Sequence, residues 1–142
     1  MRYFLALGAF GCGLAVILGA FAAHGLKGQL SPSSIATFST GVTYQFYHSL
    51  GLLVLGLAGL HFGEQRGLKM AGWFFVVGIV LFSGSLYGLS LFKWTFLGPI
   101  TPLGGLSFIL GWGLMVSHFL KHDAKVDELP SSNKVDKHAD KH

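Results

Sequence analysis

Long apolar stretches separated by short polar segments dominate this chain. Because lipid offers the backbone no hydrogen-bond partners, only helices or a closed barrel can cross a bilayer. A spanning helix takes about 20 apolar residues, whereas a barrel strand alternates between lipid-facing and lumen-facing positions. The apolar stretches here are long and do not alternate, so the pattern predicts an all-α membrane protein with four transmembrane helices in a compact bundle. The predicted spans cover about residues 3–23, 42–62, 70–92 and 102–120, within a domain of residues 1–121.

Two hydroxyl–proline pairs predict where helices begin. Ser31-Pro32 and Thr101-Pro102 each place an N-cap residue before a proline at the first helical position, where a missing N–H costs nothing. The second helix is therefore expected to start as early as Pro32, ahead of its fully apolar stretch.

The charged residues are sparse and unevenly distributed. Of the 142 residues, 51% are hydrophobic and 11% are charged, against about 25% charged in soluble domains. Residues 1–121 carry six basic side chains and a single acidic one, Glu64, so a soluble domain is excluded for most of the length. No basic patch is available to grip phosphates, which argues against nucleic acid as a partner. Residues 122–142 are polar and predict a disordered cytoplasmic tail.

The basic residues also predict the orientation. With four spans, the N-terminus, the loop at 63–69 and the C-terminus lie on one side of the membrane. The opposite side holds only Lys27 and Lys93. Cytoplasmic loops carry the excess of Lys and Arg, so both termini are expected inside, in the cell's inner (cytoplasmic) membrane. The basic residues on that side are Arg2, Arg66, Lys69, Lys121 and Lys125.

A cleaved signal peptide is the alternative interpretation of the N-terminus. Arg2, the apolar run and Ala20-Phe21-Ala22 imitate its charged start and its cleavage site. The apolar run of about 20 residues is longer than the roughly 7–15 of a signal core. An uncleaved first span is therefore favoured.

Small residues recur at four-residue spacing and form smooth ridges on the predicted helices. Such ridges let helix backbones approach closely in a membrane. They could pack within one bundle, which is the favoured interpretation, or form a contact between two copies of the chain. The candidate packing residues are Gly11, Ala15, Gly19 and Ala23 in the first helix, and Gly84 and Gly88 in the third.

The few polar side chains near or within the spans gather at one depth, in the predicted outer half of the bilayer. They could hold the helices in register through hydrogen bonds worth about 0.6 kcal/mol each on average. Alternatively they could line a pocket for a ligand or a proton, because His48 is the one side chain inside a span that changes charge near neutral pH. The first interpretation is favoured. The candidate pocket residues are His24, Tyr44, Gln45, His48, Ser85, Tyr87 and Thr101.

Catalytic and metal chemistry find little support in the sequence. Zinc needs three or four ligands, whereas His24 and His48 supply two and Cys12 lies far from them along the predicted span. A Ser-His-Asp triad lacks its acid, because no carboxylate precedes Glu64. We therefore predict no catalytic residue, no metal and no cofactor. Trp112 falls in mid-span and is expected to pack against a neighbouring helix.

Four ordered motifs resemble the YgdD/YwdK-type family of small membrane proteins, a domain of unknown function. The resemblance covers about residues 1–121 and implies a four-span inner-membrane protein without an assigned activity, cofactor or catalytic residue. Thr43 departs from the family pattern, in which glutamine is common at that position. The motifs are Gly19-Ala-Phe-Ala-Ala-His24-Gly-Leu, Thr40-Gly-Val-Thr-Tyr44-Gln-Phe-Tyr-His48, Leu81-Phe-Ser-Gly-Ser-Leu-Tyr87 and Leu97-Gly-Pro-Ile-Thr101-Pro-Leu-Gly-Gly105.

These observations predict an integral cytoplasmic-membrane protein with a structural or accessory role exercised through helix contacts. The alternative is a small-solute transporter or channel that uses the outer-half polar pocket around His48. An intramembrane enzyme is the least favoured hypothesis. The expected partners are the lipid bilayer and a second copy of the chain, and the sequence identifies no small-molecule ligand.

Overall fold

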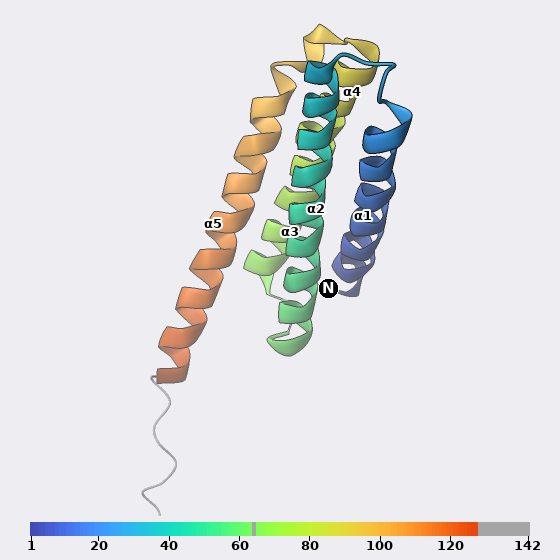
Figure 1. Cartoon of the computed structure of the whole chain (residues 1–142). Coiled ribbons are helices and arrows are strands. Elements are labelled where there is room, and N and C mark those ends of the chain that lie inside the picture. The colour runs from blue at the N-terminus through green and yellow to red at the C-terminus, as the bar shows by residue number, and fades with distance from the viewer. Residues whose placement is uncertain (64, 128–142) are drawn as a thin grey trace, which may run out of the picture.

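The computed structural model describes residues 1–63 and 65–127, and these residues fold into helices joined by short connections (Figure 1). The described chain is all-α, as predicted. Two π-helical turns and one 3₁₀ turn interrupt or extend the α-helices. The elements in chain order are α1 (Arg2–Ala20), η1 (Phe21–Gly25), α2 (Pro32–His61), α3 (Arg66–Gly78), η2 (Ile79–Ser83), α4 (Gly84–Phe92), η3 (Thr95–Leu97) and α5 (Ile100–Asp127).

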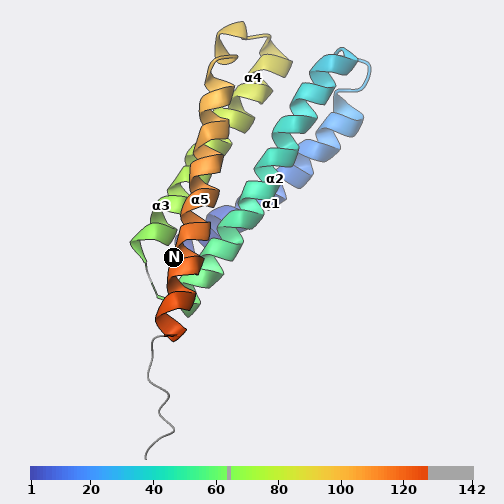
Figure 2. The ribbon, with the colours of Figure 1, turned by 90° about the vertical axis from the view of Figure 1, so that its left-hand side faces the viewer.

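The helices form two antiparallel hairpins that stand side by side. Helices α1 and α2 make the first hairpin, and the continuous rod α3–η2–α4 makes the second with α5 (Figure 1). The N-terminus and the α2–α3 connection lie at one end, which we call the N-terminal end, and the other two connections lie at the opposite end. Figure 2 shows that the hairpins are closest near the N-terminal end and diverge toward the other.

Three helical stretches of the described chain are long and apolar enough to cross a membrane: Arg2–Gly25, Arg66–Phe92 and Thr95–Lys121. Helix α2 is not among them although it has 30 residues. Its apolar residues are concentrated in its second half, after His48, while its first half carries hydroxyl, amide and imidazole groups. By length and apolar composition, the structure therefore supports three of the four predicted spans.

One of the two predicted helix starts is confirmed and the other is wrong. The backbone N–H of Ser34 donates to Ser31 Oγ over 3.2 Å, so Ser31 caps α2 and Pro32 is its first residue. Helix α5 instead begins at Ile100, which places Thr101 inside the first turn. Pro99 already precedes this turn, and a second proline within a first turn costs no hydrogen bond. The helix can therefore start one residue earlier than the Thr-Pro pair suggests.

The helices are longer than their apolar stretches. The helical path of the first span continues through a π turn to Gly25, and that of the last reaches Asp127, past the domain boundary predicted at residue 121. Helical hydrogen bonds continue into polar flanks, which an apolar criterion does not count. The rest of the predicted disordered tail, residues 128–142, lies outside the described residues.

Aromatic rings fill the space between helices at positions where a neighbouring helix carries glycine. The Phe75 ring lies against both Gly51 and Gly111, where an added Cβ would come within 2.8 and 2.6 Å of it. Phe4 occupies the same kind of slot at Gly72. Both phenylalanines have no exposed surface, and they belong to the main core cluster together with Leu52, Leu55, Leu68, Phe108 and Met115.

Part of the predicted small-residue ridge on α1 packs against α2. Gly11 faces the Ser49 side chain, Gly19 lies near Val42, and Ala15 is buried. Ala23 is exposed at the end of the ridge. These contacts lie within one chain, which is the interpretation that the sequence favoured for the first helix.

The two predicted packing glycines of the third span have different surroundings. Gly88 is buried beneath Leu97 of the η3 turn. Gly84 is exposed, and an added Cβ there would meet no atom within 4 Å. The two residues therefore do not act as one packing surface.

We expect Gly104→Ala to lower the free energy of unfolding by about 1–3 kcal/mol, the usual cost of overpacking. A Cβ at Gly104 would collide with the backbone nitrogen and Cα of Phe82, which cannot rotate away. Gly105→Ala is the matched control, because its Cβ would meet the Phe82 ring at an ordinary 3.8 Å. Thermal unfolding of both purified variants in detergent measures the difference, and equal midpoints would contradict this packing.

Candidate functional site

Six of the seven predicted pocket residues form three hydrogen-bonded groups. Gln45 and Tyr87 belong to the first group, Tyr44 and His48 to the second, and Ser85 and Thr101 to the third. His24 lies in the η1 turn with its side chain exposed, apart from the other six.

Gln45 links three helical segments through its amide group. Its Nε2 donates to the carbonyl oxygen of Gly11 on α1 over 3.0 Å, and its Oε1 accepts from the Tyr87 hydroxyl of α4 over 2.8 Å. The Gln45 side chain is 3% exposed. Gly11 accepts this bond because its lack of a side chain lets α2 come close. Both ends of the Gln45 amide are thus bonded inside the protein.

His48 is enclosed by aromatic rings and bonded at both nitrogens. Its ring stacks on Phe108 with 3.4 Å between centroids and meets Phe75 edge-on at 5.4 Å. Its Nδ1 lies 2.7 Å from the carbonyl oxygen of Tyr44, one turn earlier in α2. The Trp112 indole Nε1–H of α5 donates to its Nε2 over 3.1 Å.

These partners determine the tautomer of His48. A carbonyl oxygen only accepts, so Nδ1 carries the hydrogen, and an indole N–H only donates, so Nε2 offers its lone pair. The result is a neutral imidazole that joins α2 to α5. Protonation of Nε2 would give the ring a second hydrogen. It would remove the acceptor that Trp112 uses and place a positive charge among apolar rings.

Ser85 and Thr101 tie α4 to the start of α5. Their hydroxyl oxygens are 2.7 Å apart, and Ser85 Oγ also donates to the carbonyl oxygen of Phe82. Ser107, which is not among the predicted pocket residues, makes a comparable bond: its Oγ donates to the carbonyl oxygen of Phe74 over 2.7 Å. A hydroxyl within a glycine-rich stretch of a span was the available signal for Ser107, since close helices favour such bonds.

The sequence also missed the role of Trp112 in this site. It predicts that Trp112 packs against a neighbouring helix, and the ring does lie 4.8 Å from that of Phe75. An indole N–H away from water needs an acceptor, and His48 Nε2 provides it. Spacing along one helix cannot reveal this pairing, because the two residues are 64 positions apart.

Two buried hydroxyls have no hydrogen-bond partner among the described residues, those of Ser49 and Ser83. Both side chains have no exposed surface. Ser49 packs against Gly11 and the Gly8 position of α1. We interpret it as a small residue at a close helix crossing, because no room for a larger side chain exists there.

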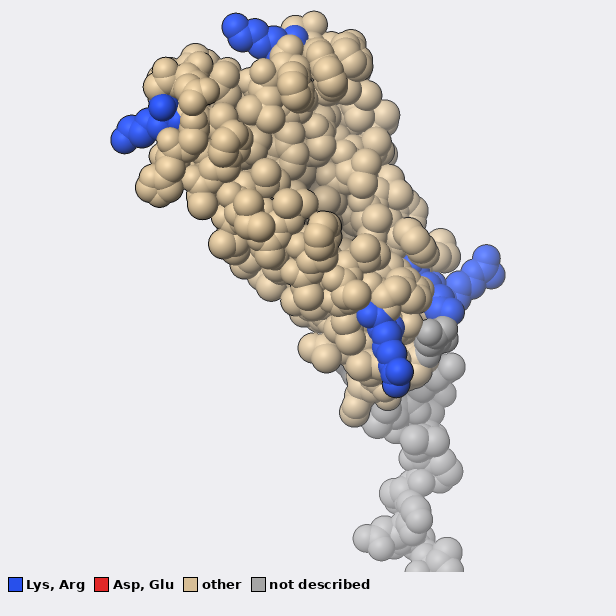
Figure 3. Space-filling view, turned by 90° about the vertical axis from the view of Figure 1, so that its right-hand side faces the viewer, with Lys and Arg blue, Asp and Glu red and all other residues tan. Residues whose placement is uncertain are grey.

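Among the side chains that the structure describes, the charged ones are confined to the two ends of the molecule. Figure 3 shows Lys and Arg only at the extremities of this face, with an uncharged surface between them. The described helices carry large exposed apolar side chains, among them Phe10, Val16, Leu57, Ile109 and Leu120. An apolar belt between two charged ends is typical of a protein that lies in a bilayer.

Comparison with known proteins assigns the family. Residues 18–105 match the model of a family described as "Protein of unknown function (DUF423)". The chain belongs to this family. The match confirms the resemblance predicted from the four motifs. No solved structure matches the chain significantly.

The family's relatives are similar over most of their length. UPF0382 membrane protein SERP0230 of Staphylococcus epidermidis is 47% identical over 85% of this chain and 98% of its own. UPF0382 membrane protein YwdK of Bacillus subtilis is 45% identical over 86% of this chain and 99% of its own. A third, UPF0382 membrane protein SH2409 of Staphylococcus haemolyticus, is 43% identical over 82% of this chain. The chain is thus a membrane protein of an uncharacterised family with several apolar helices.

We expect Tyr87→Phe to destabilise this family member by about 0.5–1.5 kcal/mol, because it removes the hydroxyl that donates to Gln45 and leaves the buried amide oxygen unpaired. Tyr44→Phe is the control. Tyr44 is 41% exposed and contributes its backbone carbonyl, not its hydroxyl, to the site. Chemical or thermal unfolding in detergent compares the two, and a larger loss for Tyr44→Phe would contradict the assigned bonds.

Proposed function

We propose that this chain is a four-span protein of the cytoplasmic membrane with both termini inside the cell, and that it has a structural or accessory role. Support for α2 as the fourth span comes from its packing. Successive glycines of α2 lie against α1 along the hairpin, Gly56 at Leu5 and Gly59 at Met1. A helix of 30 residues is about 45 Å long, which exceeds the thickness of the hydrocarbon core.

The polar groups of α2 do not prevent it from crossing. Gln45 and His48 turn toward the bundle and are bonded there, so lipid does not meet them. A buried, bonded polar group costs far less in a membrane than one facing lipid. The apolar criterion fails for α2 because it counts these groups as if they were exposed.

The distribution of basic residues supports the orientation. Arg2, Arg66 and Lys69 belong to the N-terminal end, together with Lys121 near the end of the last span. The opposite end carries Lys27 and Lys93. By the positive-inside rule the N-terminal end faces the cytoplasm. Packing of Phe4 into the core also favours retention of the first helix over its removal as a signal peptide.

The state of His48 carries the proposal of a structural role. Both of its ring nitrogens and both ends of the Gln45 amide are engaged within the protein, and aromatic rings cover the imidazole. A solute site needs polar atoms that are free to exchange partners. These groups are instead arranged to join helices, so contact between helices is the role that they support. A transporter or channel is the alternative outcome, and an enzyme remains the least favoured.

A flux assay separates the structural role from transport. The purified protein is reconstituted in liposomes that contain a pH-sensitive dye, and proton, potassium and acetate gradients are applied in turn. We expect the rates of protein-free liposomes, unchanged by His48→Leu, because the polar groups of Gln45 and His48 are bonded within the protein. Flux above this background that His48→Leu abolishes, in a variant with normal thermal stability, would establish transport and contradict the proposal.

A further inference from the structure

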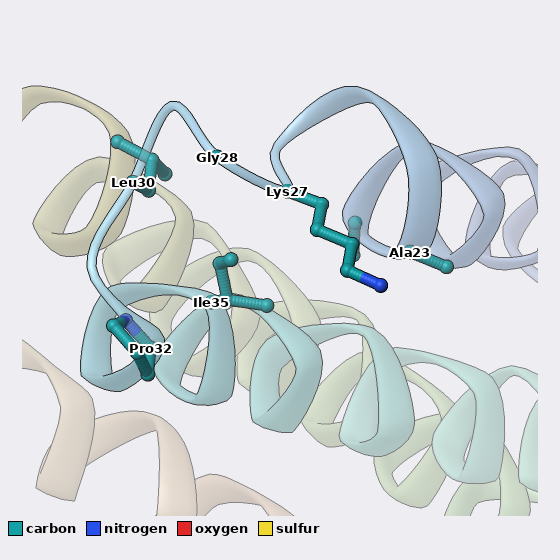
Figure 4. A pocket seen from close by; sticks show the side chains of 7 residues that line it. Ala23, Lys27, Gly28, Leu30, Pro32 and Ile35 are labelled. Atoms are coloured by element: carbon teal, nitrogen blue, oxygen red, sulfur yellow. The ribbon is translucent and has the colours of Figure 1, made fainter.

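A hollow lies between the two helices of the first hairpin at the end that bears Lys27. Its walls are mostly apolar, formed by Ala22 and Ala23 from the η1 turn and by Leu30, Pro32 and Ile35 from the loop and the start of α2. Figure 4 shows the Lys27 side chain reaching from the loop across this hollow, with its nitrogen between α1 and α2. A single cation therefore stands over an apolar recess.

A second, separate hollow lies along the same pair of helices, nearer the middle of the molecule. It is lined from α1 by Ala15 and Val16 and from α2 by Val42, Phe46 and Tyr47, with Thr43 between them. Between the two hollows, Gly19 comes close to α2, because an added Cβ there would meet the Val42 side chain at 3.6 Å. We call the line of these two hollows, from Lys27 to Ala15, the α1–α2 groove.

The groove has the dimensions and chemistry of an acyl-chain site. From Ala15 to Ala23 it runs for about 12 Å at the helical rise, comparable with the roughly 15 Å of one leaflet's hydrocarbon. The hollow toward the middle of the molecule is apolar apart from the hydroxyl groups of Thr43 and Tyr47. The other end of the groove meets Lys27 at the level where lipid headgroups lie, and a lysine at the end of a span extends its ammonium to that level.

Charge decides between a lipid and a second copy of the chain. Among residues 1–121 the sole acidic residue in the sequence is Glu64, and none belongs to the segments that line the groove. A second copy inserted in the same orientation would bring Lys27 and Lys93 to this level and no carboxylate to pair with them. An anionic phospholipid supplies the missing negative charge and the chain that fits the recess.

We propose that the α1–α2 groove binds one acyl chain of an anionic phospholipid, whose phosphate pairs with the ammonium of Lys27. The assignment of this lipid to the outer leaflet rests on the proposed orientation. The pairing itself does not, because it depends only on the groove and on Lys27.

Native mass spectrometry of the full-length protein tests this site, with an equimolar mixture of dioleoylphosphatidylglycerol and dioleoylphosphatidylcholine as the probe. We expect the wild type to retain the anionic lipid preferentially. Lys27→Gln reduces this preference about fivefold, the contribution of one basic residue near a headgroup. Lys93→Gln, the matched lysine at the same end, leaves the preference unchanged. Equal effects of the two substitutions would show that the preference depends on the net charge of this end and not on a site at Lys27, which would overturn the proposal.

A second pair of variants tests the groove. Ala23→Leu fills it from an exposed position and is expected to lower retention of both lipids without loss of thermal stability. Gly13→Leu is the control on the same helix, since an added Cβ at Gly13 meets no atom within 4 Å. Lipid retention unaffected by Ala23→Leu, or a dimer that this variant dissociates, would overturn the proposal.

The orientation is tested separately, so that the two failures can be told apart. In a Cys12→Ser background, a membrane-impermeant maleimide should label Gln29→Cys in intact cells and leave Gln65→Cys unlabelled. The reverse pattern would contradict the proposed orientation and move the lipid to the inner leaflet. It would leave the Lys27 result untouched.

Discussion

The close approach of helices at glycine is the constraint on which the rest of this structure depends. Water supplies no hydrophobic force between helices inside a bilayer, so contact area and hydrogen bonds must hold them together. Phe75 shows how the chain meets this need, because its ring fits against Gly51 of one neighbour and Gly111 of another. The absence of a side chain at Gly11 likewise lets α2 come close enough for the Gly11 carbonyl oxygen to accept a hydrogen bond from Gln45.

The buried polar side chains add hydrogen bonds between the helices that these glycines bring close together. Gln45 and His48 belong to one helix and reach partners on three others, so α2 is the element through which both hairpins are joined. This explains why a helix with several polar groups in its first half has a central position. Polar groups cost stability where they face lipid and contribute it where they face one another across a helix contact.

The sequence predicts the helical class, the family and the start of α2, because each depends on local composition or on contiguous motifs. The predicted start of α5 was wrong. Two prolines, Pro99 and Pro102, allow the first turn to begin at Ile100 as well as at Pro102. For the polar residues the sequence favours hydrogen bonds between helices and leaves a shared pocket as the alternative. Their separation into groups depends on rotation of each helix and on partners such as Trp112, which lies 64 positions from His48.

The protonation state of His48 gives the most direct measurement of whether the polar groups serve helix contacts. Nitrogen-15 NMR of the protein in lipid bilayers, with labelled histidine and a His48→Asn variant for assignment, distinguishes the tautomers. The enclosed arrangement predicts a neutral ring with the hydrogen on Nδ1 and an Nε2 that accepts from Trp112. A hydrogen on Nε2, or an imidazolium that exchanges with water at neutral pH, would show an open polar site and contradict the structural role.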